Sequence, residues 1–141
     1  MGKVLFSTKA TSQNGPAGGY VKSEDELIDL KLVNPLMKSK EVGSNPEQLF
    51  AAGYSSCFDG ALNFVAMKKK IKVKSETTAE VSFLKDPEDQ GYKMGVTLHV
   101  KVKGVSNDEA EQLLEAAHQF CPFSKAIEGN VDVKINPQIE A

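Results

Sequence analysis

The sequence contains two cysteines among its 141 residues, and thiols are the most reactive groups that it offers. Cys57 lies within an apolar segment, and Cys121 stands before Pro122, where a helix is expected to end. Each cysteine alone is more often a small buried hydrophobe. Together they could form a thiol that is oxidised to a sulfenic acid and a second thiol that converts this acid to a disulfide. The fold would then have to bring their Cα atoms within about 7 Å of each other.

A second interpretation of these residues is a zinc site. His118 lies three positions before Cys121, and Cys57 and His99 would complete a set of four ligand-type residues. The spacing matches no closed zinc pattern, and His99 is expected on the wet face of its strand. The sequence also has no P-loop, G-x-G-x-x-G turn or G-x-S-x-G elbow. We therefore expect neither a metal nor a cofactor.

The most informative segment is expected to form a helix from position 46 to about 69. Asn45 supplies an N-cap side chain, Pro46 suits the first helical position, and Glu47 places an acid in the first turn. Apolar residues occupy almost every face, which is typical of a helix buried on most sides. The segment ends in Lys68–Lys70, cations that suit a helix C-terminus. Without further knowledge, Glu47 needs no role beyond its interaction with the helix dipole.

Patterns of alternating apolar and polar residues indicate strands on both sides of this helix. We expect strands at 3–9 and 26–33, with a turn-rich loop at 13–19 between them. Residues 71–85 and 92–103 are expected to form a hairpin whose one face is packed and whose other face is wet.

The C-terminal part completes the expected fold class. A capping box at Ser106–Glu109 begins an amphipathic helix that ends at Cys121, and after a short turn residues 131–135 form a last strand. The order βββ-α-ββ-α-β with antiparallel hairpins is α+β. We expect one domain over residues 1–141. Its parts are N-terminal strands in 1–44, a central helix in 45–70, and the hairpin, second helix and last strand in 71–141.

Composition limits the class of protein. With 40% apolar residues, 26% charged residues and a formal net charge of −2, the chain is expected to fold and to lack a basic face for nucleic acid. It has no run of 18 apolar residues and no signal-peptide stretch at its start, so we expect a soluble cytoplasmic protein without a membrane partner. All 17 basic residues are lysines, so the chain contains no guanidinium group.

Two blocks of the sequence are specific enough to compare with known families. The first is NPEQLFAAGYSSCF at 45–58, and the second is AHQFCPFSKA at 117–126, followed by GNVDV at 129–133. These blocks resemble the organic hydroperoxide resistance proteins, the Ohr branch of the OsmC/Ohr family, and the resemblance covers essentially the whole chain. It implies an OsmC/Ohr-like fold in which antiparallel sheets wrap around a long buried central helix within an intertwined homodimer.

The resemblance also implies an activity. Members of this branch are thiol-dependent peroxidases for organic and fatty-acid hydroperoxides, with active sites at the subunit interface. Cys57 matches the peroxidatic cysteine, Cys121 the resolving cysteine and Glu47 the active-site glutamate. A lipoylated protein or another dithiol would re-reduce the disulfide by exchange.

Four aromatic residues near these positions are candidates for contact with the alkyl chain of a substrate. An apolar surface would favour organic hydroperoxides over hydrogen peroxide, although plain core packing explains the same residues equally well. They are Phe50, Phe58, Phe120 and Phe123.

The chain departs from the family pattern at one position. The family has an arginine in a Gly-Gly-Arg loop, which pairs with the glutamate and stabilises the thiolate, and here Ala17 or Tyr20 stands in its place, depending on the alignment. Lys22 follows the loop and is the best candidate substitute, with Lys38 and Lys40 as further candidates. Because an ammonium cannot form the bidentate pair of a guanidinium, we expect a slower or differently tuned peroxidase.

The positions of Glu47 and Cys57 constrain any joint role. Ten residues on one continuous helix give about 15 Å of rise, so the two side chains cannot touch within such a helix. Either the helix breaks near Gly53, or Glu47 reaches Cys57 of a second copy. The apolar residues on almost all faces of the helix favour the second arrangement, and we predict an obligate homodimer with two composite sites.

Two alternatives keep the fold but change the function. Without the arginine, the protein could be an OsmC-like redox sensor or a hydrophobic-ligand binding protein with little peroxidase activity. It could also belong to the OsmC branch and prefer a different reductant.

Overall fold

The chain forms its strands and helices in the order βββ-α-ββ-αα-β. The computed structural model describes residues 2–15 and 18–141, and the chain separates into two compact units, Met1–Leu49 and Phe50–Ala141. The expected α+β class is therefore confirmed, with one short helix added between the second long helix and the last strand.

The first unit contains an antiparallel sheet with the strand order β1-β2-β3, formed by β1 (Ala10–Gln13), β2 (Gly18–Ser23) and β3 (Asp29–Val33). The expectation of a strand at 3–9 is wrong, because pairing begins at Ala10 in a polar segment without apolar alternation. The strand β2 lies partly in the expected loop. It accommodates Gly19 at a φ of 115°, where the Cβ of any other residue would collide with the Gln13 carbonyl.

This first unit buries little of its apolar surface. Among its described residues, only Ser23 is buried. A small sheet needs an apolar face packed against another element to be stable, and exposed apolar patches of this kind mark interaction surfaces. The most exposed of the large apolar side chains are Val4, Leu5, Phe6, Leu27, Leu36 and Val42.

The second unit contains a sheet with the strand order β4-β5-β6, formed by β4 (Lys74–Lys85), β5 (Tyr92–Lys103) and β6 (Val133–Glu140). The hairpin β4-β5 is antiparallel, as expected, but β6 runs parallel to β5. The expectation of purely antiparallel sheets is therefore wrong for this pair. A parallel pair requires a crossover connection, which the helices after β5 supply.

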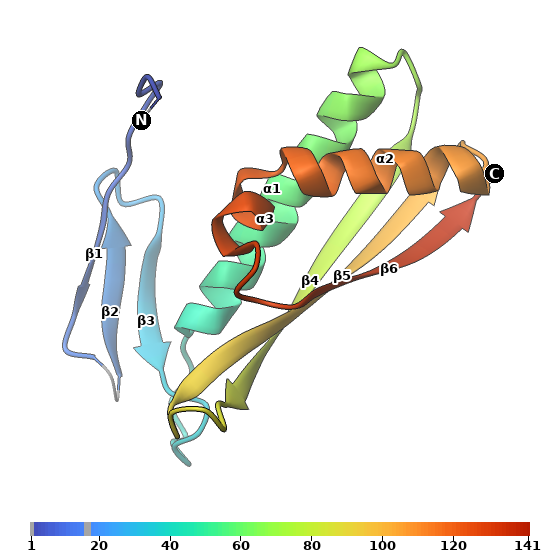
Figure 1. The fold of residues 1–141 in the computed structure, drawn as a ribbon. Coiled ribbons are helices and arrows are strands. Elements are labelled where there is room, and N and C mark those ends of the chain that lie inside the picture. The colour runs from blue at the N-terminus through green and yellow to red at the C-terminus, as the bar shows by residue number, and fades with distance from the viewer. Residues whose placement is uncertain (1, 16–17) are drawn as a thin grey trace. The chain divides into compact units, whose positions relative to one another are not determined.

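Three helices cover one face of this sheet (Figure 1): α1 (Pro46–Lys68), α2 (Asn107–Phe120) and α3 (Pro122–Ile127). The capping box that begins α2 is present, since the Ser106 hydroxyl accepts from the backbone N–H of Glu109. The expected short turn after α2 is instead the helix α3. The core lies between helices and sheet and includes the inward residues of β5, namely Val96, Leu98, Val100 and Val102.

The helix α1 begins as expected, because the Asn45 side chain accepts a 2.8 Å hydrogen bond from the N–H of Gln48. It is not buried on most sides within this chain: Phe64 is 37% and Met67 64% exposed. Its buried face consists of Tyr54, Phe58, Ala61, Leu62 and Ala66.

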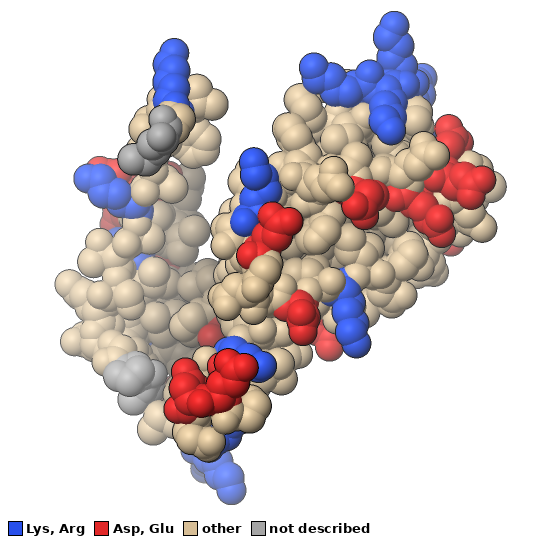
Figure 2. All heavy atoms as spheres, in the orientation of Figure 1, with Lys and Arg blue, Asp and Glu red and all other residues tan. Residues whose placement is uncertain are grey.

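The last turn of α1 and the residues after it carry a group of lysines, visible in blue at the end of the helix (Figure 2). These side chains are exposed, as expected for Lys68–Lys70. Within the described residues, no helix combines the length and the apolar character that crossing a bilayer requires.

Candidate active site

The two cysteines meet in the second unit. The thiol of Cys121 donates a hydrogen bond to Sγ of Cys57 over 3.2 Å, and both residues are free thiols. Cys57 is half-buried on α1, whereas Cys121 is fully buried. Since the S–S bond of a disulfide measures about 2.05 Å, an approach of about 1 Å between the sulfur atoms suffices for bond formation.

The chain turns at Cys121–Pro122, where α2 ends and α3 begins. This corner, residues 121–124, positions the second sulfur. Cys121 has extended backbone angles, φ −65° and ψ 120°, as expected for a residue before proline. Its N–H still bonds to the carbonyl of Ala117 over 2.8 Å, which ends α2, and Pro122 begins α3 directly afterwards. One residue therefore closes one helix, opens the next and carries the buried thiol.

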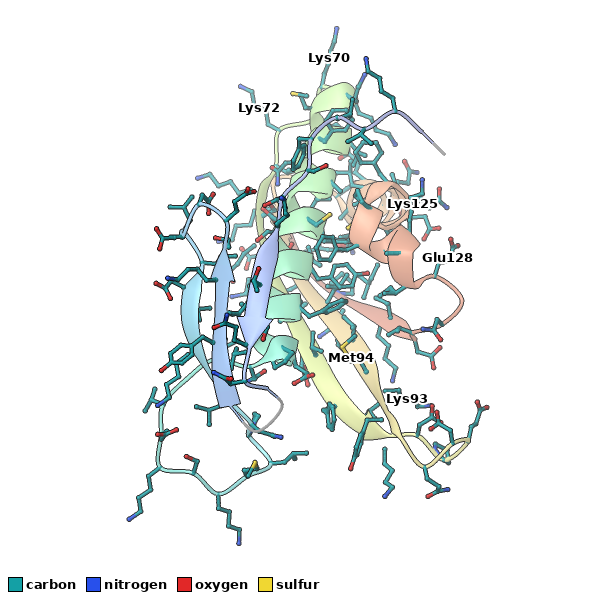
Figure 3. All side chains as sticks on the ribbon, turned by 90° about the vertical axis from the view of Figure 1, so that its left-hand side faces the viewer. Lys70, Lys72, Lys93, Met94, Lys125 and Glu128 are labelled. Atoms are coloured by element: carbon teal, nitrogen blue, oxygen red, sulfur yellow. The ribbon has the colours of Figure 1, made fainter. Side chains whose placement is uncertain are left out.

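The surroundings of Cys57 favour its neutral form. Burial raises the pKa of the Cys57 thiol above its ordinary value, and a negative charge on Cys121 would raise it further. A backbone N–H of Phe123, which donates to the sulfur, lowers the pKa in opposition. Among the described residues, no cation is one of the main causes of this pKa shift. The exposed Lys125, four residues after Cys121 in the sequence, lies on the side of α3 that is turned away from α1 (Figure 3).

A buried polar network lies beside the two sulfur atoms. The Ser124 hydroxyl is 2.6 Å from the Tyr54 hydroxyl and 2.9 Å from Nδ1 of His118. Burial raises the pKa of Tyr54, the bond to Ser124 lowers it, and charge on Cys121 or Cys57 raises it. The Tyr54 hydroxyl is thus within electrostatic range of both thiols.

Aromatic rings surround the same corner. The ring of Phe123 packs against Phe50 and Tyr54, with centroid distances of 6.1 and 6.0 Å. It also lies against Gly53, where an added Cβ would come within 3.0 Å of the ring. The absence of a side chain at Gly53 therefore lets α3 approach α1 closely.

A second aromatic pair lies at the surface of the second unit. Phe120, which precedes the buried thiol, stacks on Phe64 of α1 with a centroid distance of 4.8 Å and an interplanar angle of 4°. The rings are partly exposed, Phe120 by 48% and Phe64 by 37%. The ammonium of Lys68 lies 5.6 Å from the centroid of Phe64, a cation–π contact.

Comparison with known proteins identifies the family. The family described as OsmC-like protein matches residues 38–136. The organic hydroperoxide resistance protein OhrB of Bacillus subtilis is 48% identical over 133 residues, covering 94% of this chain and 97% of the relative. The chain belongs to the OsmC/Ohr family. OhrA of the same organism is 50% identical over 138 residues and covers 96% of this chain and 97% of its own length.

The fold comparison agrees with the family assignment. The crystal structure of Bacillus subtilis OhrB superimposes with a TM-score of 0.92 at 46% identity, covering 96% of this chain and all of the other. The OsmC/Ohr resemblance inferred from the two sequence blocks is thereby confirmed.

The structure of this OsmC/Ohr chain brings several of the expected residues together. Cys57 and Cys121 are in contact, and Phe123 contributes both a ring and a backbone N–H to the corner. Phe50 packs on this corner. Phe58, in contrast, is fully buried in the hydrophobic core, so its ring offers no open surface within this chain.

Other expected residues of this family member lie elsewhere in the chain. Glu47 is half-buried in the first turn of α1, and α1 runs unbroken through Gly53, which removes the broken-helix arrangement. Lys22 lies in β2 and forms ion pairs with Glu26 at 3.2 Å and with Asp29 at 3.9 Å. These acids raise its pKa, the hydrogen bond to Glu26 most.

Two residues, Ala17 and Tyr20, are candidates for the position of the family's arginine, and the structure describes one of them. Ala17 lies outside the described residues. Tyr20 lies in β2 and is 56% exposed.

The four residues considered for zinc do not converge. His99 binds Glu80 through Nε2 at 2.8 Å and Asn136 through Nδ1 at 3.0 Å, on the partly exposed face of the sheet. His118 binds Ser124 instead. Within residues 2–15 and 18–141, no group of three or more His, Cys, Asp or Glu side chains could hold a metal ion.

Sequence reasoning missed Tyr54, Ser124 and Phe64. A signal existed for Tyr54, because a phenol on a mostly apolar helix usually needs a hydrogen-bond partner when buried. Ser124 and Phe64 carried no comparable signal, since their partners lie far away in the sequence.

Proposed function

We propose that this chain is a thiol-dependent peroxidase that reduces organic hydroperoxides to alcohols. The observation that carries the proposal is the distance of 3.2 Å between Sγ of Cys57 and Sγ of Cys121. The names of its relatives support the substrate class, because OhrA and OhrB are organic hydroperoxide resistance proteins.

In the first step, the Cys57 thiolate attacks the distal oxygen of the hydroperoxide. The O–O bond breaks, the alkoxide takes up a proton and leaves as the alcohol, and Cys57 becomes a sulfenic acid. In the second step, the Cys121 sulfur attacks Cys57, the S–O bond breaks, and hydroxide leaves as water with the Cys121 proton. An external dithiol, such as a lipoylated protein, then reduces the disulfide by exchange.

Apolar surface beside the cysteines supports a preference for organic substrates. The stacked rings of Phe120 and Phe64 are partly exposed, so an alkyl chain could pack on them and leave water. Phe120 directly precedes Cys121, which carries the second sulfur. Phe50 and Phe123 offer further apolar surface around the corner, and both pack against the core cluster that contains Phe58.

Activation of Cys57 is proposed to come from a second copy of the chain. Burial raises the pKa of Cys57, so a nearby charge or hydrogen-bond donor is needed to ionise it at neutral pH. Glu47 of a second copy would act there together with a cation, for which Lys22 is the first candidate. The exposed apolar side chains of the first unit support a homodimer, because association would remove them from water.

The test of the proposed activity is thiol oxidation. Reduced protein is mixed with cumene hydroperoxide, and the loss of free thiols is followed by stopped flow. We expect rapid loss of two thiols per chain, none in Cys57→Ser, and a trappable sulfenic acid in Cys121→Ser. Oxidation no faster than that of free cysteine would contradict the proposal.

A redox sensor or a hydrophobic-ligand binding protein is the second candidate function. It is favoured by the raised pKa of Cys57 and by the absence of arginine from the sequence. Under this alternative the same assay would show slow oxidation with the disulfide still forming. Comparing a lipoylated protein with thioredoxin as reductant would separate the Ohr from the OsmC branch.

A further inference from the structure

We propose that Ser124 is the positioning residue for disulfide formation, because its hydroxyl holds the corner that carries Cys121 against the helix that carries Cys57. This inference rests on the proposed function, and it concerns the second chemical step alone.

Ser124 joins three helices through one buried hydroxyl. It lies in the first turn of α3 and is only 3% exposed. Its oxygen is 2.6 Å from the Tyr54 hydroxyl on α1 and 2.9 Å from Nδ1 of His118 on α2. A hydroxyl can donate one hydrogen bond and accept others, so Ser124 can satisfy both partners at once. The bond to Tyr54 is buried, and a hydrogen bond in such a low-dielectric site is a strong constraint.

Within the described residues, the hydrogen bonds to the Cys57 sulfur come from the corner that Ser124 holds. Cys121 and Phe123 stand three residues and one residue before Ser124, and both donate to that sulfur. The helix α3 is only six residues long, so its own backbone bonds fix its position weakly. The bond between Ser124 and Tyr54, the packing of the Phe123 ring on Tyr54 and the bond from the Phe123 N–H to the Cys57 sulfur tie it to α1.

The disulfide-forming step depends strongly on this placement. The Cys121 sulfur must approach the sulfenic sulfur of Cys57 from the side opposite the departing hydroxide, and reacting atoms about 3 to 3.5 Å apart are productive. The observed 3.2 Å lies in this range. A displacement of about 1 Å can slow such a reaction by about 100-fold. The peroxide step does not involve the Cys121 sulfur, so it depends less on the placement of the corner.

The closing experiment separates the two steps. Ser124→Ala and Tyr54→Phe each remove one end of the Tyr54–Ser124 bond, and Tyr54→Phe keeps the ring that packs on Phe50 and Phe123. After a pulse of cumene hydroperoxide, we expect the sulfenic acid to form at a rate within about twofold of wild type. We expect the conversion of the sulfenic acid to the disulfide, here called closure, to be at least about tenfold slower than in wild type. Dimedone should therefore trap the sulfenic acid.

Two further variants show whether the effect is one of position. Ser75→Ala is the matched control, because it removes a 2.8 Å bond from Asn63 that ties α1 to β4, away from the corner. It should leave both steps unchanged. Ser124→Thr keeps the hydroxyl and should restore closure at least in part. Closure at the wild-type rate in both Ser124→Ala and Tyr54→Phe, or equal slowing in Ser75→Ala, would overturn the proposal.

The proposed function and the positioning role can fail separately. If wild-type Cys57 does not react with hydroperoxide, the peroxidase proposal fails. Disulfide formation driven by diamide, which first adds to one thiol and is then displaced by the other, still compares wild type with Ser124→Ala. We expect slower closure in the variant with this oxidant too, and equal closure would contradict the role of Ser124.

Discussion

The ring of Phe123 rests on the backbone of Gly53, where the Cβ of any larger residue would lie 3.0 Å from the ring. Because the backbone N–H of Phe123 also donates to the Cys57 sulfur, this contact links the spacing of α1 and α3 to the chemistry of the thiols. The close approach explains why a glycine stands in the middle of a helix, where it is otherwise destabilising by roughly 0.5–1 kcal/mol relative to alanine.

Gly53→Ala should therefore slow disulfide formation without a large change in stability. Higher helix propensity would stabilise α1 by up to about 1 kcal/mol, and displacement of the Phe123 ring would offset this gain. We expect closure to slow by about tenfold, as measured by quenched-flow alkylation after a pulse of hydroperoxide.

Gly60→Ala is the matched control for this substitution. Gly60 lies in the same helix, and an added Cβ there meets nothing within 4 Å. This variant should raise the free energy of unfolding by up to about 1 kcal/mol and leave closure unchanged. Faster or equal closure in Gly53→Ala would show that the ring moves without affecting the sulfur atoms.

In a single chain without a second copy to activate the thiol, the reactivity of Cys57 should increase with pH beyond the range of an ordinary thiol. Burial raises its pKa from 9.0, so in the isolated chain the thiolate fraction grows about tenfold per pH unit up to that value and beyond. Alkylation by iodoacetamide, mapped to Cys57 by mass spectrometry between pH 6 and 10, measures this dependence. A plateau below about pH 8 would instead indicate a cation or a donor supplied by a second copy.

The same shift affects stability at high pH. Above pH 9.0, the unfolded chain ionises Cys57 while the folded chain still holds the proton. The free energy of unfolding therefore falls as the pH rises above this value, and Cys57→Ala should remove that part of the decrease. Urea denaturation of reduced protein at pH 8 and pH 10 would test the sign.

Phe120→Ala should reduce the preference for organic hydroperoxides. Phe120 is 48% exposed and stacks on Phe64, so the substitution removes apolar surface beside the thiols at a modest cost in stability. We expect kcat/KM for cumene hydroperoxide to fall by about tenfold and the value for hydrogen peroxide to stay within about twofold.

A second exposed aromatic stack provides the control for this prediction. Phe83 is 45% exposed and stacks on Tyr92 at the same centroid distance of 4.8 Å, but on the hairpin β4-β5. Phe83→Ala should leave both kcat/KM values unchanged. Equal losses in the two variants would assign the effect to general destabilisation rather than to substrate contact.

Local signals in the sequence predicted those elements whose determinants lie close together in the chain. Asn45 and Pro46 define the start of α1, and Ser106 with Glu109 defines the start of α2, because a cap acts over three residues. The expected hairpin partners also pair as β4 and β5. Alternation carries no information on strand direction, so the parallel placement of β6 beside β5 could not be predicted.

The candidate site was predictable only in its reactive groups. Cys57 and Cys121 were singled out by residue type and by resemblance, and the structure brings their sulfur atoms into contact. The bond between Tyr54 and Ser124 joins residues 70 positions apart, and only the packing of α3 on α1 brings them together. The polar β1 escaped prediction for a related reason, since its pairing with β2 depends on neighbouring strands and not on its own pattern.

The composite site predicted for a homodimer can be tested by complementation. Glu47 and Cys57 lie ten residues apart on the unbroken helix α1, a rise of about 15 Å, so a joint role requires two copies.

Glu47→Gln and Cys57→Ser should each be nearly inactive alone. After unfolding, mixing and refolding, half of the dimers would contain one chain of each kind, and each of these would have one intact site. We expect about a quarter of the wild-type peroxidase activity to return. Light scattering at low concentration should give twice the 15.3 kDa of one chain. Absence of complementation between two folded, mixed dimers would show that Glu47 does not act on Cys57 of the other copy.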